Sequence, residues 1–201
     1  MRRTPLAALA AAALIAVAGC TPAPQQTPQA PAASQPADQA TAAAAMLAKL
    51  GLENLTPRQI VEKLDQDTTP RPLQMKASVR PDHLLIGDGT TEAALPIEGD
   101  NSFYLSIAPF VNRTHECHFH SLATCQGELV SKPVHVLIKD ASGKVLIDQD
   151  ATTYTNGFVA FWLPQGITGT VTVESDGKSG TVPFSSQAND DATCLTTLKL
   201  A

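Results

Sequence analysis

The sequence predicts an α+β protein, in which a short N-terminal helical pair precedes a mainly antiparallel β-sandwich or open-barrel domain. Two observations support this prediction. Apolar residues recur at helical spacing between residues 42 and 64, whereas from Met75 onward short β-type runs alternate with turn residues. The folded part, roughly Ala42 to Ala201, is long enough for one ordinary domain with a sizeable core.

The first residues have the pattern of a secretory signal. A basic start, Met1-Arg2-Arg3, precedes an apolar stretch from Leu6 to Val17 and the small residues Ala18-Gly19. The apolar stretch is too short to span a bilayer comfortably. We therefore predict a signal peptide over residues 1–19 and export to the cell envelope.

Cys20 follows this signal directly. The residues Val17-Ala18-Gly19-Cys20 resemble the lipobox of bacterial lipoproteins, whose cysteine takes a diacylglyceryl group. The alternative is an ordinary secretory signal with an incidental cysteine. We predict that Cys20 is lipidated and anchors the protein to a membrane, and that residues 20–45, rich in Pro, Ala and Gln, form an extended tether.

Two helices are predicted in and just before residues 46–73, the N-terminal helical subdomain. The first covers Ala42 to Leu50 and stops at Gly51. The second begins with the capping sequence Thr56-Pro57-Arg58-Gln59 and ends before Pro70. Each helix has one apolar face, which must pack on the β-rich domain or on a second protomer, so that a homodimer is one expected arrangement.

Residues 74–201 are predicted to form the β-rich, metal-binding domain. Within it, Val134 to Ile138, a turn at Asp140 to Gly143, and Val145 to Ile147 indicate a hairpin. The full set of predicted strands is Gln74 to Val79, His83 to Ile86, Phe103 to Phe110, Val134 to Ile138, Val145 to Ile147, Phe158 to Leu163, Thr168 to Val173, Gly180 to Phe184 and Cys194 to Leu200.

Apart from Cys20, the chain has three cysteines, Cys117, Cys125 and Cys194. An exported protein with an odd number of thiols either pairs between chains or keeps a reactive or metal-binding thiol. One interpretation is a disulfide with a spare thiol. The other is a metal site, since three thiolates suit a soft ion such as Cu(I).

The second interpretation gains support from three histidines that lie beside two of these cysteines. The segment begins His115-Glu116-Cys117-His118-Phe119-His120 and ends at Cys125. Structural cysteines scatter through a core, whereas the ligands of a metal must converge. Because imidazole nitrogens suit Cu(II) as thiolates suit Cu(I), we predict a copper site. His118 and His120 are candidate ligands or helpers, and His115 is ranked behind them.

Local geometry restricts this site. Cys117 and Cys125 would lie more than about 25 Å apart in a strand and about 12 Å apart in a helix, too far to share an ion. The chain between them must therefore turn back, or the two cysteines bind separately. The same turn would also permit a Cys117–Cys125 disulfide. Cys194 can complete a three-thiolate set if the last strand lies beside this loop.

The residues Glu-Cys-His-Phe-His-Ser from Glu116 and Thr-Cys-Gln-Gly-Glu-Leu from Thr124, with a third cysteine near the C-terminus, resemble the CueP family of periplasmic copper-binding proteins. The resemblance implies that Cys117, Cys125 and Cys194 are the copper ligands and that the protein serves copper binding and resistance in the envelope. It also implies reduction of Cu(II) to Cu(I) and delivery of copper to an envelope superoxide dismutase.

Several alternatives compete with a copper carrier. Zinc is the rival metal, although the spacing lacks Cys-x2-Cys pairs. A thiol–disulfide oxidoreductase would use Cys117 and Cys125, but no Cys-x-x-Cys is present. A metal-free, disulfide-stapled binding lipoprotein is the third. A formal net charge of −5 argues against nucleic acid as a partner. The sequence contains no glycine-rich phosphate loop and no Gly-x-Ser-x-Gly elbow. We expect a metal-binding protein rather than an enzyme, with cupric reductase activity as the open alternative.

Overall fold

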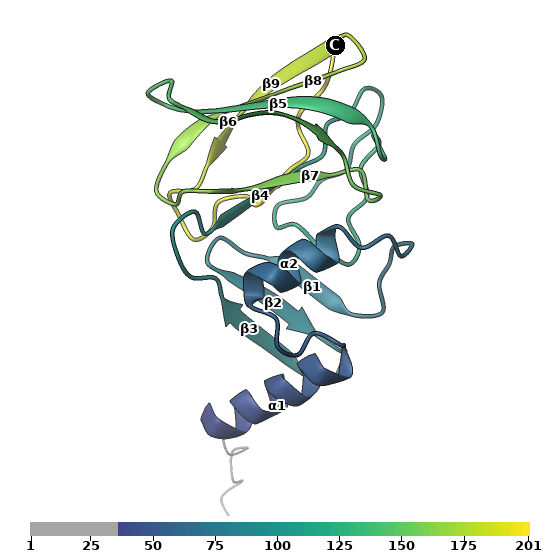
Figure 1. Cartoon of the computed structure of the whole chain (residues 1–201), viewed down its shortest axis with the longest axis vertical. Helices are drawn as coiled ribbons and strands as arrows, with labels where there is room; N and C mark the ends of the chain where they lie inside the picture. Colours follow the sequence, from purple (N-terminus) through teal and green to yellow (C-terminus); the bar gives the residue numbers. More distant parts are fainter. Residues whose placement is uncertain (1–35) are drawn as a thin grey trace, which may run out of the picture. The chain divides into compact units, whose positions relative to one another are not determined.

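The structure, a computed structural model, describes residues 36–201. The predicted signal peptide, Cys20 and most of the predicted tether lie outside the described residues. The described chain contains two helices followed by mostly antiparallel sheets, none of which closes into a barrel, and this confirms the predicted α+β class (Figure 1). Its elements are α1 (Pro36–Lys49), α2 (Pro57–Asp65), β1 (Lys76–Val79), β2 (His83–Gly87), β3 (Glu92–Pro96), β4 (Phe103–Ile107), β5 (Pro133–Asp140), β6 (Val145–Thr152), β7 (Val159–Leu163), β8 (Thr168–Ser175), β9 (Lys178–Ser185) and β10 (Cys194–Leu195).

Helix α2 begins as its sequence predicts. The Thr56 side chain accepts a hydrogen bond from the Gln59 backbone N–H, and the Gln59 side chain accepts one from the Thr56 N–H, which completes the capping box. The helix ends at Asp65, before the predicted limit at Pro70. Helix α1 begins at Pro36 rather than at the predicted Ala42. No helix among residues 36–201 is long and apolar enough to cross a membrane.

The apolar faces of both helices pack on the first three strands of the same chain. Strands β1, β2 and β3 form an antiparallel sheet in that order. Strand β3 is absent from the predicted set because its sequence, Glu-Ala-Ala-Leu-Pro, has little β propensity and gains its conformation from pairing with β2. We call the shared apolar cluster the helical core, and its buried members are Met46, Leu52, Ile60, Val61, Leu64, Ala77, Val79, Leu84, Ile86, Ile97, Tyr104 and Leu122.

A second sheet, in the order β10-β4-β7, separates the helical core from a second core. Every residue of β4 is buried because both faces of this strand are covered. Phe103 and Leu105 face one core, whereas Tyr104 between them faces the helical core. Strand β10 pairs with β4 in parallel and has only two residues, so the predicted last strand, Cys194 to Leu200, is much shorter than expected.

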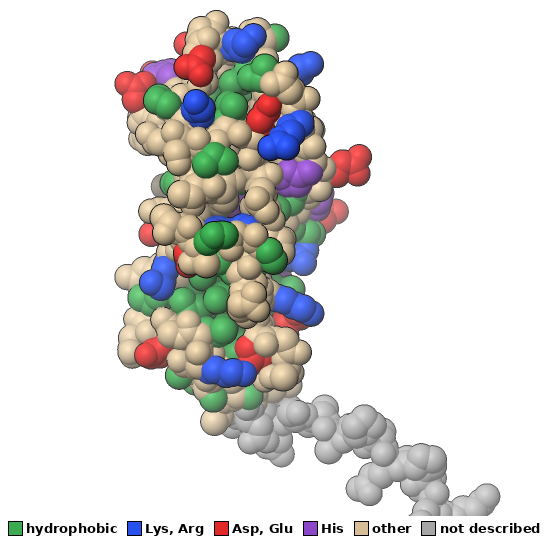
Figure 2. Space-filling view, turned by 90° about the vertical axis from the view of Figure 1, so that its right-hand side faces the viewer, with side chains coloured by type: hydrophobic (Ala, Val, Ile, Leu, Met, Phe, Trp, Pro, Cys, Tyr) green, Lys and Arg blue, Asp and Glu red, His purple; other side chains and the backbone are tan. Residues whose placement is uncertain are grey.

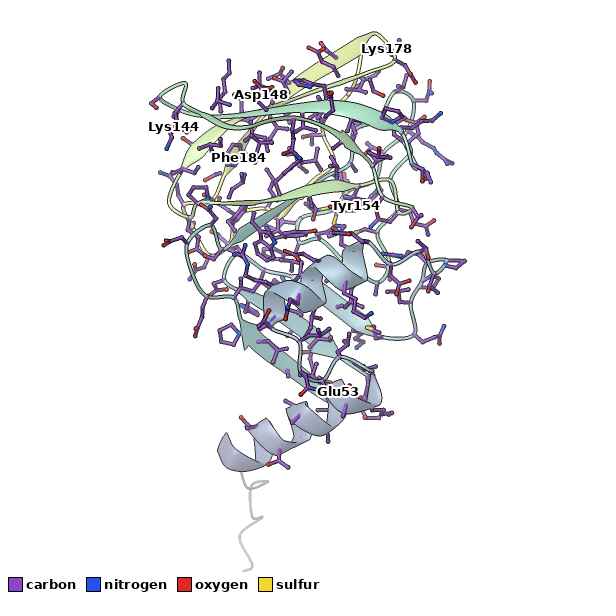
Figure 3. The ribbon with its side chains drawn as sticks, viewed as in Figure 1. Glu53, Lys144, Asp148, Tyr154, Lys178 and Phe184 are labelled. Atoms are coloured by element: carbon purple, nitrogen blue, oxygen red, sulfur yellow. The ribbon has the colours of Figure 1, made fainter. Side chains whose placement is uncertain are left out.

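A four-stranded antiparallel sheet, in the order β6-β5-β8-β9, covers the other side of the second core (Figure 1). The predicted hairpin is present as β5 and β6, with a bend held by the hydrogen bond from the Asp140 N–H to the Lys144 carbonyl. Phe184 of β9 is directed between the two sheets (Figure 3). Alternating residues of β5 and β8 are buried, as expected for strands of a sandwich. The predicted sandwich-like arrangement of sheets is thereby confirmed.

Candidate metal centre

The long connection between β4 and β5 carries Cys117 and Cys125, and it turns back between them, which is the first of the two arrangements that the sequence left open. The Cys125 N–H donates to the Ser121 carbonyl at 3.0 Å, and the Thr124 hydroxyl donates to the Ser121 hydroxyl at 2.7 Å. This tight turn brings the Sγ atoms of Cys117 and Cys125 to 3.4 Å from each other.

Strand β1 holds the turn in place. The Val79 N–H donates to the His120 carbonyl at 2.9 Å, and the Leu122 N–H donates to the Ala77 carbonyl at 3.0 Å. The Leu122 side chain is fully buried in the helical core. Backbone pairing and an apolar anchor therefore fix the segment between the two cysteines.

Cys194 reaches the same point from the opposite end of the sequence. Its N–H donates to the His118 carbonyl at 3.1 Å, while β10 pairs with β4. One ring nitrogen of His115 and the sulfurs of Cys117, Cys125 and Cys194 all lie within 4.8 Å of one another. The fold thus assembles one nitrogen and three sulfur atoms from the connection between β4 and β5 and from β10.

The donor set fits a soft metal ion. The three cysteines are free thiols, and Nε2 of His115 is buried without a hydrogen-bond partner in the described part of the chain. A buried polar atom without a partner is costly, and a metal ion at this point could use such a nitrogen. Thiolates with one imidazole suit Cu(I) and Zn²⁺ by ligand type.

His118 and His120, which the sequence analysis ranked above His115, lie outside this four-residue group. His118 is exposed, and its Nε2 is 2.7 Å from the Asp190 carbonyl. His120 is fully buried, with Nε2 at 2.9 Å from Asp65 Oδ1 and Nδ1 at 3.7 Å from Cys194 Sγ. The structure therefore places His115 beside the thiols and His120 behind one of them.

Asp65 and His120 form a charged pair in the interior. Burial alone would raise the pKa of Asp65, but the charge of His120 and hydrogen bonds from His120, Tyr104 and Asn156 lower it. Burial would lower the pKa of His120, but its interactions with Asp65 and Cys125 raise it to about 9. Both residues are therefore charged at neutral pH.

The three thiols change one another's pKa in different directions. Contact with the sulfur of Cys117, supported by that of Cys194, lowers the pKa of Cys125, whereas the contact with Cys125 raises the pKa of Cys117 to about 12. Hydrogen bonds to Cys117 and Cys125 also raise the pKa of Cys194. The three sulfurs therefore do not titrate independently of one another.

Glu128 closes the loop that carries the site. Its carboxylate accepts hydrogen bonds from the backbone N–H groups of Val111 and Asn112 at 2.7 and 2.9 Å. Sequence reasoning did not find this role or that of Asp65, because the partners of both residues are remote in sequence and carry no motif. The only local signal at Asp65 is its place at the end of a capped helix.

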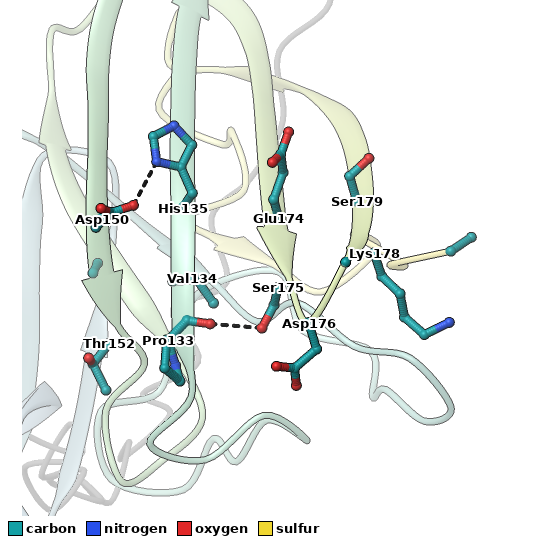
Figure 4. A pocket seen from close by; sticks show the side chains of 13 residues that line it. Pro133, Val134, His135, Asp150, Thr152, Glu174, Ser175, Asp176, Lys178 and Ser179 are labelled. Carbon is teal, nitrogen blue, oxygen red and sulfur yellow. Dashed lines mark hydrogen bonds and ion pairs between the residues drawn. The ribbon is translucent and has the colours of Figure 1, made fainter.

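Two hollows differ in their relation to the thiols. One, of about 720 Å³, is lined by His115, Cys117 and Cys125 and leads to the site. The larger, of about 830 Å³, lies over β5, β6 and β8 and includes His135 but no cysteine (Figure 4). There both ring nitrogens of His135 already face carboxylates, those of Asp148 and Asp150.

The face shown in Figure 2 carries charges of both signs. Lys and Arg side chains are interspersed with Asp and Glu, and histidine side chains reach the surface beside acidic ones. Neither sign dominates this face.

Fold and site together define a class: an α+β protein with a partly buried three-thiol, one-imidazole site suited to a soft metal ion. The family model for the periplasmic copper-binding protein CueP matches residues 59–199. A solved chain described as the crystal structure of S.CueP is 38% identical, with a TM-score of 0.74 over 84% of this chain and 100% of that one. No curated relative matches the chain.

The chain belongs to the CueP family of periplasmic copper-binding proteins. The resemblance seen in the sequence is thereby confirmed, and so is copper as the metal of the family. The periplasmic location of the family supports the predicted export.

Proposed function

We propose that this protein captures copper with the thiolates of Cys117, Cys125 and Cys194 and a ring nitrogen of His115, for copper resistance, buffering or delivery in the envelope. The observation that carries the proposal is the convergence of these four donor atoms within 4.8 Å. Membership in a copper-binding family supports copper over zinc. Three sulfurs favour Cu(I) as the bound state.

The close pair Cys117 and Cys125 supports a reductive step before capture. Each of two Cu(II) ions accepts one electron, while the two thiols release two protons and form one S–S bond. Their 3.4 Å separation requires only a small movement for bond formation. Cu(I) would then be held by thiols that are still reduced in another molecule, or in the same one after re-reduction by an external thiol.

We further propose that the protein works at a membrane surface. The lipobox-like Val17-Ala18-Gly19-Cys20 and the Pro-rich segment after it support a lipid anchor with a tether. A fixed carrier would pass copper to an acceptor enzyme of the envelope, such as a superoxide dismutase. Mass analysis of the membrane-extracted protein for a diacylglyceryl group on Cys20, with Cys20→Ala as control, tests the anchor.

Anaerobic Cu(I) titration against a chelator tests the binding proposal. We expect Cys117→Ser, Cys125→Ser and Cys194→Ser each to bind Cu(I) at least about 10-fold more weakly than wild type, since each loses one soft ligand. His115→Ala tests the nitrogen, and His118→Ala is its matched control because His118 lies outside the donor set. Unchanged Cu(I) affinity in all three serine variants would contradict the proposal.

A further inference from the structure

The buried pair Asp65 and His120 lies behind the proposed copper site, and its presence calls for a reason other than stability. Both side chains are 0% exposed, and their contact is 2.9 Å. Desolvation of a buried ion pair offsets most of its attraction, so that an apolar pair of the same volume would often stabilise the fold equally well. Stability alone therefore does not explain this pair, and the neighbouring thiol of Cys194 is the group on which it can act.

Asp65 is held rigidly. Its Oδ1 accepts a hydrogen bond from Asn156 Nδ2 at 2.7 Å in addition to that from His120 Nε2, and its Oδ2 accepts one from the Tyr104 hydroxyl at 2.9 Å. The carboxylate has little freedom to rotate because both oxygens have fixed partners. It therefore determines the orientation of the His120 ring, which also contacts the Phe158 ring at a centroid distance of 4.4 Å.

His120 in turn contacts Cys194 of β10 and Thr193, the residue before this strand. Its backbone N–H donates to the Thr193 hydroxyl at 3.0 Å, and its Nδ1 lies 3.7 Å from the Cys194 sulfur, within the range of a sulfur hydrogen bond. Cys194 is the thiol that comes from outside the turned loop. A contact that orients its sulfur thus decides whether the third thiolate meets the other two.

We propose that Asp65 and His120 are positioning residues of the copper site, which hold Cys194 Sγ in its binding position through His120 Nδ1. This inference rests on the proposed function. Asp65 is the last residue of α2, so helix α2 also contributes to the support of the thiolates. Groups that orient a metal ligand without binding the metal change metal affinity by about 10- to 100-fold when removed.

Two variants separate the two contacts of His120. In His120→Gln the amide can still reach Asp65, but no atom remains at the position of Nδ1. In Asp65→Asn the charge is lost at nearly constant volume. Tyr104→Phe is the matched control, since it removes one hydrogen bond to Asp65 Oδ2 and leaves the contact between Oδ1 and His120 intact.

The measurements are anaerobic Cu(I) affinity, the number of sulfur ligands per copper from X-ray absorption, and thermal unfolding of the metal-free protein. We expect His120→Gln and Asp65→Asn to bind Cu(I) about 10- to 100-fold more weakly, with fewer sulfurs per copper. Tyr104→Phe should keep wild-type affinity and sulfur number even if its unfolding temperature falls. Wild-type affinity and sulfur number in folded His120→Gln would overturn the proposal.

A double-mutant cycle with Cys194→Ser provides a test that a merely structural role would not pass. If His120 acts through Cys194, the double variant Cys194→Ser/His120→Gln binds Cu(I) no more weakly than Cys194→Ser alone. Additive losses would overturn the proposal. The same cycle with Asp65→Asn serves if His120→Gln does not fold. Loss of affinity in Cys194→Ser, without an effect of either positioning variant, would leave the proposed function standing and reject this inference alone.

Discussion

The sulfurs of Cys117 and Cys125 lie 3.4 Å apart, although the two residues are eight positions apart in the sequence. The turn at Ser121 and the anchor at Leu122 produce this proximity. Cys194, which lies in β10, is within 4.8 Å of the same atoms as part of the four-residue group. The relationship yields predictions about oxidation, stability and pH.

Mild oxidation of the metal-free protein should join Cys117 to Cys125. Diamide would accept the two electrons and two protons, and Cys194 would remain free to be alkylated. Trypsin leaves Cys117 and Cys125 together in peptide 114–139 and Cys194 in peptide 179–199, so that mass spectrometry distinguishes the products. Prior loading with Cu(I) should protect both thiols. A predominant bond to Cys194 would contradict this prediction.

Leu122→Ala should destabilise the protein by about 2–5 kcal/mol, because it opens a cavity in the helical core where Leu122 is fully buried. Urea unfolding measures this loss. Copper affinity should fall as well, since Leu122 anchors the turn between two proposed ligands. Val145→Ala is the control: Val145 is 46% exposed, and its replacement should change stability by less than about 0.5 kcal/mol.

Gly157→Ala should weaken both folding and copper binding. Gly157 has a φ of +81°, and a Cβ there would lie 2.5 Å from the Gly127 carbonyl oxygen, two residues after Cys125. Gly143→Ala is the matched control, because Gly143 has a φ of +87° with no atom within 4 Å of the added Cβ. Backbone strain alone costs about 1–2 kcal/mol. Equal effects of the two substitutions on thermal stability would show that the close approach of Gly127 and Gly157 is unimportant.

Glu128 should stabilise the protein in a pH-dependent way. Hydrogen bonds from Asn112, then from Val111 and Arg113, lower the pKa of Glu128 to about 2 in the folded state. Because the folded pKa lies below the ordinary value of 4.5, the contribution is complete above pH 4.5 and is lost as the pH falls toward 2.

The measurement is the unfolding temperature of wild type and Glu128→Gln across this range. The two should differ at pH 7 and converge as the pH approaches 2. Glu53→Gln, at an exposed position in the helical part of the chain, is the control and should show no such convergence. A difference that stays constant down to pH 2 would be evidence against the carboxylate contacts.

The parts of the fold that could be predicted are those with local causes. The capping box of α2 and the β5–β6 hairpin involve residues within a few positions of one another, and both are present. Strand β3 escaped prediction because its alanines have low β propensity, so that only the partner strand β2 selects an extended conformation.

The site divides in the same way. Composition and spacing alone determined that three thiols remain after Cys20, that two lie near three histidines, and that the chain between Cys117 and Cys125 must turn back to bring them together. These conclusions need only residue types and the rise per residue of a strand or helix.

Only the tertiary structure decided which histidine accompanies the thiols. His120 turns toward Asp65, a buried carboxylate that arrives from a helix 55 positions earlier, and His118 turns toward the Asp190 carbonyl. His115 is left beside the three sulfurs. Neighbours in a sequence do not reveal the direction of a side chain, because that direction depends on partners that meet only when the chain has folded.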